Sequence, residues 1–214
     1  SNFDFVVAPE HDGLKGKNVI ASIGAIHYLR DNELDENMSY LKPRLNKEKI
    51  VTLIFGGPNQ YYDYKTIEVE KIFNKIKKNF IDSGYQLIFI PSMRTPKSVI
   101  DSAINYFDKN QVIINDIDKK AYLSSLKLAN HIVVTCDSTS MISEAAITGK
   151  PVYIAQMKHK KSIHRFEKFY KLFKDLGIIR NLENKIEHWS YHELDEVNRS
   201  ASLVREKMKK NGII

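Results

Sequence analysis

Short apolar runs alternate with longer segments of helical periodicity over most of this chain. The runs are rich in β-branched residues, which is typical of strands buried on both faces of a sheet. They predict strands at residues 50–55, 86–91, 112–115, 131–136 and 152–155. Apolar residues at helical spacing predict helices at residues 66–83, 97–107 and 119–128. This alternation predicts the α/β class, with a Rossmann-like parallel sheet and helices on both faces.

Glycine, proline and threonine mark the ends of several predicted helices. Gly84 is expected to cap the helix at residues 66–83. Thr95 is suited to cap the next helix, with Pro96 at its first position. Beyond the fifth strand, apolar spacing predicts an amphipathic helix at residues 162–176 and a polar helix at residues 194–209.

The segment after the strand at residues 131–136 carries the most residues suited to ligand binding. Asp137, Ser138, Thr139 and Ser140 form a polar turn into a short helix that also contains Glu144. Backbone N–H groups at such a helix start can bind phosphate, and a carboxylate nearby can accept hydrogen bonds from ribose hydroxyls. No capping box explains Glu144, because residue 141 is Met. Complementarity to the helix dipole is the alternative explanation.

The other strand ends add further candidates, since ligands of open parallel sheets gather at the carboxyl edge. Gly56 and Gly57 would let a ligand approach the backbone, although a tight turn is the alternative. Arg94 lies beside a helix N-terminus and is a candidate anion contact. In the first polar turn, His11 and Asp12 form a candidate general base with its orienting carboxylate, against the alternative of an ordinary surface turn.

Composition narrows the classes of partner. Lys and Arg number 33 against 26 Asp and Glu, a net charge of +7, which favours phosphates, nucleic acid or an acidic membrane surface. The alternative is a lysine-rich surface, because many lysines stand beside acidic residues. No nucleic-acid-binding signature is present, so no nucleic-acid partner is expected. A single cysteine, Cys136, excludes an internal disulfide and suits a reducing cytosol, and no metal is expected. The apolar runs are too short for a transmembrane helix.

Several segments together resemble the mitochondrial-fission ELM-one family, a group of bacterial and plant proteins. The strongest is the run Asp137-Ser138-x-Ser140-Met141-x-Ser143-Glu144-Ala145. The other matching segments are residues 7–12, 18–27, 54–58, 92–96, 133–136, 149–152, 165–166 and 194–196, with Trp189. The resemblance covers almost the whole chain. It departs at Glu10, where a basic residue is expected, which weakens an anion-binding role for that turn.

The resemblance implies the fold of the donor-binding, C-terminal half of a GT-B glycosyltransferase. It also implies the leading function, metal-independent transfer of a sugar from a nucleotide-diphosphate sugar, with Glu144 on the ribose. Ser138, Thr139 and Ser140 would then hold the diphosphate, and Arg94 would offset its charge. Family members also include epimerase-like bacterial proteins and a plant fission adaptor. A nucleotide-sugar epimerase and a non-enzymatic adaptor in membrane or organelle division are therefore the alternatives.

The same resemblance suggests how the chain is divided. Residues 1–45 hold a strand at residues 5–8 and an apolar segment at residues 19–29, expected to be the last strand and helix of an N-terminal Rossmann-like domain, followed by a linker. Residues 46–190 are expected to bind the nucleotide sugar, and the C-terminal helix in residues 191–214 to cross back to the first domain. The start of the sequence suggests that most of that domain is absent. We expect a cytoplasmic protein, with peripheral contact to an anionic membrane in the adaptor alternative.

Overall fold

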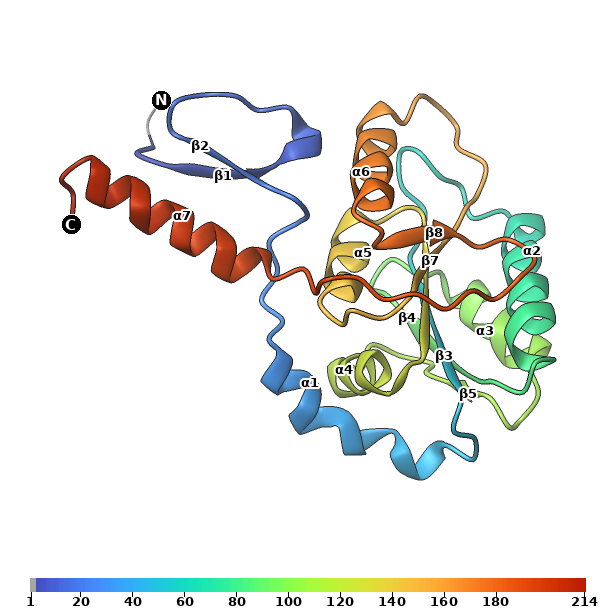
Figure 1. Cartoon of the computed structure of the whole chain (residues 1–214). Helices are drawn as coiled ribbons and strands as arrows, with labels where there is room; N and C mark the ends of the chain where they lie inside the picture. Colours follow the sequence, from blue (N-terminus) through green and yellow to red (C-terminus); the bar gives the residue numbers. More distant parts are fainter. Residues whose placement is uncertain (1–2) are drawn as a thin grey trace.

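The computed structural model describes residues 3–214 and places one parallel six-stranded sheet at its centre (Figure 1). The strand order is β5–β4–β3–β6–β7–β8. The strands are β3 (Ile50–Phe55), β4 (Gln86–Pro91), β5 (Val112–Ile113), β6 (His131–Thr135), β7 (Val152–Ala155) and β8 (Ile179–Asn181). The predicted α/β fold class is therefore confirmed.

The order of the strands reverses between β3 and β6. From β3 the chain proceeds outward to β4 and β5, then returns to β6 on the other side and continues to β7 and β8. Phe55 at the end of β3 pairs with Pro91 at the end of β4, and Ile54 pairs with Val134 near the end of β6. The carboxyl ends of these three strands thus meet at the switch point, where open α/β sheets bind ligands.

Helices cover both faces of the sheet, so every residue of its central strands β3 and β4 is buried and most are apolar (Figure 1). On one face lie α2 (Thr66–Ile76) and α3 (Lys97–Tyr106), and on the other lie α4 (Lys119–Leu128), α5 (Thr139–Ala146) and α6 (His164–Asp175). The apolar face of α2 places Phe73 against Phe55 and Phe89, with ring centroids 5.8 and 6.3 Å apart. Such aromatic contacts fix the helix over the strands.

Several predicted boundaries are corrected by the structure. The helix predicted at residues 66–83 ends its α-helical part at Ile76 and continues as a π-helical turn, η4 (Lys77–Ile81). Thr95 does not cap α3, because the N-cap is Pro96. The Thr95 hydroxyl instead donates hydrogen bonds to the carbonyl oxygens of Phe55 and Gly56. Strand β8 was not predicted, because only three residues form it and one of them is exposed.

The N-terminal segment forms a small parallel pair, β1 (Val6–Pro9) with β2 (Val19–Ser22), joined through the 3-10 turn η1 (Glu10–Asp12). The expectation of a helix within residues 19–29 is wrong. Val19 and Ile20 are β-branched and pair with Val6 and Val7, so this part is extended. The first helix is α1 (Asp31–Asn37), followed by η2 (Met38–Tyr40) and η3 (Lys42–Arg44).

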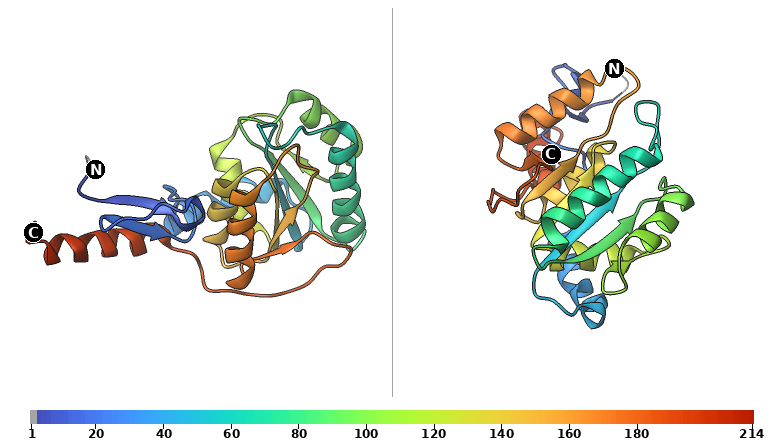
Figure 2. Two further views of the ribbon diagram at one scale, coloured as in Figure 1. Left: turned by 90° about the horizontal axis from the view of Figure 1, so that it is seen from above. Right: turned by 90° about the vertical axis from the view of Figure 1, so that its right-hand side faces the viewer.

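The last helix, α7 (Glu196–Lys210), lies along β2 rather than on the central sheet. Helix α7 and strand β2 together project away from the central sheet (Figure 2). The buried Glu196 carboxylate accepts a 2.6 Å hydrogen bond from the Ile23 amide, and Arg199 donates to the Ala21 carbonyl at 2.8 Å. These contacts tie the two ends of the described chain together. None of its helices combines the length and the apolar character needed to cross a membrane.

Candidate functional site

Two cavities adjoin at the carboxyl edge of the sheet. The Glu144 cavity, of about 360 Å³, has Ile54, Ile90 and Pro91 at the strand ends and Glu144 among its polar groups. The Arg165 cavity, of about 240 Å³, is bordered by the start of α5 and by Arg165. Arg94 and Ser138 border both cavities. One extended ligand could therefore contact both spaces along this shared wall.

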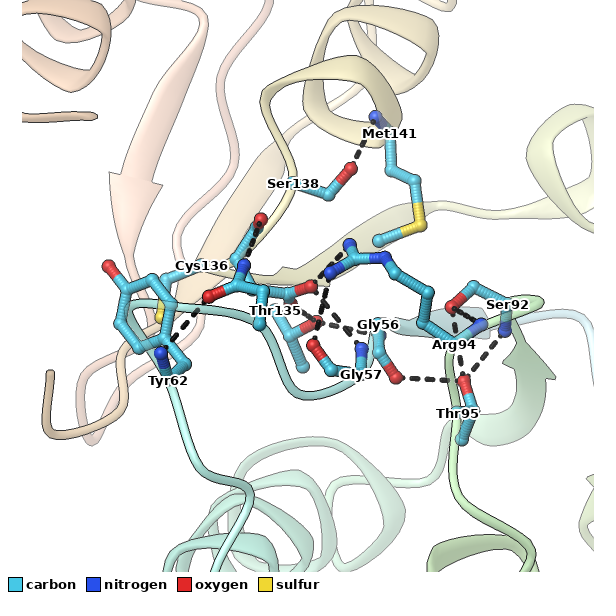
Figure 3. A network of polar contacts seen from close by, with 12 residues as sticks. Gly56, Gly57, Tyr62, Ser92, Arg94, Thr95, Thr135, Cys136, Ser138 and Met141 are labelled. Carbon is cyan, nitrogen blue, oxygen red and sulfur yellow. Dashed lines mark hydrogen bonds and ion pairs between the residues drawn. The ribbon is translucent and has the colours of Figure 1, made fainter. Parts of the chain in front are cut away.

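A buried carboxylate, Asp137, organises the wall between the strand ends, where Figure 3 shows Gly57, Arg94 and Thr135 close together. The Asp137 side chain has 0% exposure and pairs with Arg94, whose Nη2 lies 2.7 Å from Asp137 Oδ2. Thr135 Oγ1 donates to Asp137 Oδ1 at 2.7 Å, and the Tyr64 hydroxyl donates to the same oxygen. Burial and the neighbouring Asp137 raise the pKa of Tyr64, which keeps its hydroxyl protonated as a donor. Asp137 thus orients Arg94 and joins β3, β4 and β6.

Gly56 and Gly57 are required by close packing within this wall. A Cβ on Gly56 would lie 2.3 Å from both Asp137 carboxylate oxygens, and one on Gly57 would lie 1.8 Å from the Arg94 carbonyl oxygen. Neither glycine borders the two cavities. The glycines therefore allow the loops after β3, β4 and β6 to approach one another, and it is Arg94 that borders the cavities.

The start of α5 presents hydrogen-bond donors to the Arg165 cavity. Ser138 is the N-cap, and its hydroxyl accepts from the Met141 amide at 3.3 Å. The first N–H groups of a helix have no carbonyl partner within it, which leaves those of Thr139 and Ser140 directed beyond its start. Thr139 and Ser140 both border this cavity. The helix dipole adds partial positive charge there, so this end of α5 favours an anion.

Glu144 lies one helical turn further along α5, in the wall of the Glu144 cavity. Its Oε2 accepts a 2.5 Å hydrogen bond from the Tyr122 hydroxyl of α4. Burial raises the pKa of Glu144, while the hydrogen bond from Tyr122 acts in the opposite direction. One oxygen is thus occupied by Tyr122, and the other can accept hydrogen bonds from a ligand in the cavity.

Arg165 supplies a second cation at the edge of the Arg165 cavity. Its Nε lies 2.5 Å from Asp12 Oδ1, so this ion pair links α6 to turn η1. The sequence expectation for Asp12 was a partnership with His11, and Asp12 Oδ1 is 3.6 Å from His11 Nε2. Asp12 therefore lies between His11 and Arg165, with the shorter contact to Arg165.

His11 is buried away from both cavities. Its side chain is 1% exposed, its ring packs edge-on against Phe169 with centroids 5.1 Å apart, and neither ring nitrogen has a hydrogen-bond partner in the described structure. Burial lowers the pKa of His11. The structure does not bring His11 together with Arg94, Ser138 or Glu144, which border the two cavities.

No acidic, histidine or cysteine side chains among residues 3–214 form a group of three or more that could hold a metal ion. The cationic side chains that border the two cavities are Arg94, Arg165 and Lys119, and the N–H groups at the start of α5 lie beside them. These side chains and the start of α5 can stabilise a bound anion at this edge of the sheet.

Comparison with known proteins decides the family. The family model for mitochondrial fission ELM1 matches residues 1–208. This chain belongs to that family. The "Mitochondrial fission protein ELM1" of Arabidopsis thaliana is 26% identical over 208 residues, which cover 91% of this chain and 47% of the relative. "Uncharacterized protein RP120" of Rickettsia prowazekii is 24% identical over 94% of this chain and 59% of its own length. The ELM1-family chain described here thus spans about half the length of these relatives.

Solved structures share the fold of this ELM1-family chain. The UDP-GlcNAc 2-epimerase from Neisseria meningitidis bound to UDP-GlcNAc has a TM-score of 0.51 at 13% identity, covering 94% of this chain and 57% of that one. The S. aureus MnaA–UDP structure also has a TM-score of 0.51, at 15% identity, covering 99% and 60% of the two chains. At these identities the likeness establishes a GT-B-like arrangement of elements.

Sequence reasoning missed several groups at the site. Tyr122 stands within an ordinary helical pattern, and only the packing of α4 beside α5 brings its hydroxyl to Glu144. Tyr64 follows β3 at a distance in sequence and reaches Asp137 through the folded loop. Arg165 did carry a signal, since it lies in the basic stretch after β7 and in the segment resembling the ELM-one family.

Proposed function

We propose that this protein binds a nucleotide-diphosphate sugar across the Glu144 and Arg165 cavities and transfers the sugar as a GT-B-like, metal-independent glycosyltransferase. The observation that carries the proposal is the adjoining pair of cavities at the switch point of the sheet, with Arg94 and Ser138 in their shared wall. One cavity offers a carboxylate and apolar strand ends, and the other offers helix N–H groups and an arginine.

The nucleoside part of the ligand suits the Glu144 cavity. Ile54, Ile90 and Pro91 provide apolar surface for a base and a ribose ring. The free oxygen of Glu144 can accept hydrogen bonds from ribose hydroxyls, as acidic residues do in other nucleotide-binding α/β sites. Its aliphatic neighbours reduce the competition from water, which strengthens such hydrogen bonds.

The diphosphate suits the Arg165 cavity. The N–H groups of Thr139 and Ser140, with the dipole of α5, favour phosphate oxygens at the helix start. Cleavage of the bond between sugar and diphosphate builds negative charge on the leaving nucleoside diphosphate. The helix N–H donors at the start of α5 can offset such charge, because they are already oriented before the reaction.

The solved relatives lend support to this ligand class. Their names state that the Neisseria meningitidis epimerase is bound to UDP-GlcNAc and that the S. aureus MnaA structure contains UDP. The same names favour a second candidate, a nucleotide-sugar epimerase, which would use the same donor site. We also propose that β1, β2 and α7 belong to one domain and the central sheet to another, because α7 packs on β2.

Binding is tested by calorimetry on the protein with uridine, guanosine, cytidine and adenosine diphosphates and their sugars. The variant Glu144→Ala should weaken binding by about tenfold or more, the usual effect of losing a hydrogen bond to a charged group. The control Glu206→Ala changes an exposed carboxylate on α7 and should bind as the wild type does. Unchanged affinity in Glu144→Ala would remove the ribose role.

Product analysis separates the candidate activities. Release of free nucleoside diphosphate from the bound nucleotide sugar indicates transfer to an acceptor or to water. An isomerised sugar that remains attached to its nucleotide indicates epimerisation. Absence of binding to every nucleotide tested would overturn the proposal and favour the adaptor alternative. The apolar side chains of α6 offer that alternative no membrane surface, because Phe166, Phe169 and Phe173 are buried.

A further inference from the structure

The two arginines at the Arg165 cavity differ in how their charges are paired. Arg94 is paired with Asp137, which has 0% exposure and also accepts hydrogen bonds from Thr135 and Tyr64. Arg165 is paired with Asp12, and these side chains are 58% and 31% exposed. In the first pair the carboxylate is buried and the guanidinium is 42% exposed, whereas both members of the second pair reach solvent and join two separate segments of the chain.

This difference decides which arginine can transfer its contact to a ligand. Withdrawing Arg94 would leave the Asp137 carboxylate buried without its ionic partner, which is strongly unfavourable. The Arg94–Asp137 pair therefore stays together and contributes little net charge to the cavity. Withdrawing Arg165 leaves Asp12 in contact with water, and exposed ion pairs contribute little to stability. Arg165 is thus the arginine whose charge is available to a bound anion.

We propose that Arg165 binds the diphosphate of the ligand and that Asp12 competes with the ligand for it, so that filling the cavity exchanges an Arg165–Asp12 contact for an Arg165–phosphate contact. This inference rests on the proposed function for the identity of the ligand. A diphosphate carries more charge than one carboxylate and offers more acceptor oxygens, so it competes effectively for Arg165.

The exchange has a consequence for turn η1. The Asp12–Arg165 pair is the ion pair that joins η1 to α6 in the described structure. The remaining contact includes the ring of His11 against Phe169, and neither His11 nitrogen is hydrogen-bonded there. Loss of the ion pair therefore leaves η1 held by apolar packing. Ligand binding is expected to raise amide hydrogen exchange at residues 10–13.

Calorimetry with inorganic pyrophosphate and with UDP tests the exchange in four variants. Arg165→Gln should weaken pyrophosphate binding about tenfold, because it removes a charge-assisted contact. Asp12→Asn should tighten binding about threefold or more, because it removes the competitor at the cost of a weak surface pair. Lys168→Gln removes an exposed charge from the same helix and serves as the matched control, with affinity expected within about twofold of wild type.

The double variant Asp12→Asn with Arg165→Gln separates competition from simple repulsion. If Asp12 acts by occupying Arg165, the double variant binds as Arg165→Gln does, since the two effects are not additive. If Asp12 acts only by repelling the anion, it tightens binding in both backgrounds, and the exchange is overturned. In the supporting case, Asp12→Asn without ligand also shows the faster amide exchange at residues 10–13.

The outcomes for this inference and for the proposed function are distinct. Pyrophosphate binding that Asp12→Asn does not tighten overturns the exchange and leaves the proposed function standing. Tightened pyrophosphate binding without any affinity for nucleotides supports the exchange and overturns the proposed function. Failure of pyrophosphate and UDP to bind both the wild type and Asp12→Asn overturns both.

Discussion

Tyr122 donates a 2.5 Å hydrogen bond to Glu144, and this bond joins α4 to α5 in the wall of the Glu144 cavity. Burial and the Glu144 charge hold the pKa of Tyr122 well above its ordinary value, so the hydroxyl remains a donor. Burial alone would push the pKa of Glu144 further upward, and the hydrogen bond opposes this. Tyr122 thus helps to keep Glu144 ionised as a hydrogen-bond acceptor.

Removing the Tyr122 hydroxyl should make nucleotide binding more sensitive to acid. In Tyr122→Phe the pKa of Glu144 rises further, because the opposing hydrogen bond is lost. Binding falls as the carboxylate is protonated, so the fall begins at a higher pH than in the wild type. Calorimetry between pH 5 and 8 measures this shift. Tyr106→Phe removes a hydroxyl bonded to Asn74 on the other face and should keep the wild-type profile. If the pH profile of binding for Tyr122→Phe coincides with that of the wild type, the role given to Tyr122 is contradicted.

A side chain at position 57 should disrupt the wall. In Gly57→Ala the new Cβ would lie 1.8 Å from the Arg94 carbonyl oxygen, so backbone must move. We expect a loss of about 3 kcal/mol or more in the free energy of unfolding, measured by urea denaturation. Gly84→Ala is the control, because Gly84 has φ +89° with no atom near the added Cβ, and left-handed strain there costs about 1 kcal/mol. Equal losses of unfolding free energy in Gly57→Ala and Gly84→Ala would show that the backbone around Gly57 can move without further cost.

The pair of Arg94 and Asp137 should behave as one unit. Asp137→Asn removes the buried charge from a site built for it, and Arg94→Gln leaves Asp137 without its cation. Each change should lower the free energy of unfolding by about 3 kcal/mol. The double variant should lose less than the sum of the single losses, with a coupling energy above about 1 kcal/mol. Additive losses in urea denaturation would mean that the pair contributes no specific interaction.

His131 should make stability depend on pH. Burial lowers its pKa to about 4, against about 6.5 for an unfolded histidine. Between these values only the unfolded chain binds the proton, so the free energy of unfolding falls as pH decreases from 6.5 to 4. The loss attributable to His131 is on the order of 1 to 3 kcal/mol. In His131→Phe the dependence should flatten, whereas the exposed-histidine control His164→Gln should retain it. An unchanged slope in His131→Phe would contradict the assignment.

The strands at the centre of the sheet were predictable because they are buried on both faces. Residues 50–55, 86–91 and 152–155 were predicted with the bounds that the structure gives. Burial on both faces favours nearly continuous apolar runs, and such runs are visible in one sequence. Strand β8 has three residues, and residues 19–22 belong to an apolar segment that fits helix or strand equally well. Residues 179–181 and 19–22 form strands because they pair with neighbouring strands in the folded chain.

The candidate site divides in the same way. Strand ends of a parallel sheet share one edge, so the sequence predicted that Arg94, Ser138 and Glu144 lie near one another, and they border the Glu144 cavity. The sequence did not reveal that Gly56 and Gly57 pack against Asp137 and Arg94. It also did not reveal which acidic residue would face which arginine, since those contacts join loops far apart along the chain.

By itself, the sequence determined the α/β class, the central strands, the ELM1 family and the edge of the sheet where polar groups gather. These features follow from the local hydrophobic periodicity, from the parallel direction of the strands and from the segments that resemble the family. All three can be recognised in the sequence alone. Only the tertiary structure decided that Asp137 is enclosed and fixed to Arg94, that Tyr122 reaches Glu144, and that Asp12 meets Arg165. Burial and charge pairing depend on which distant segments pack together, and that information exists only once the chain has folded.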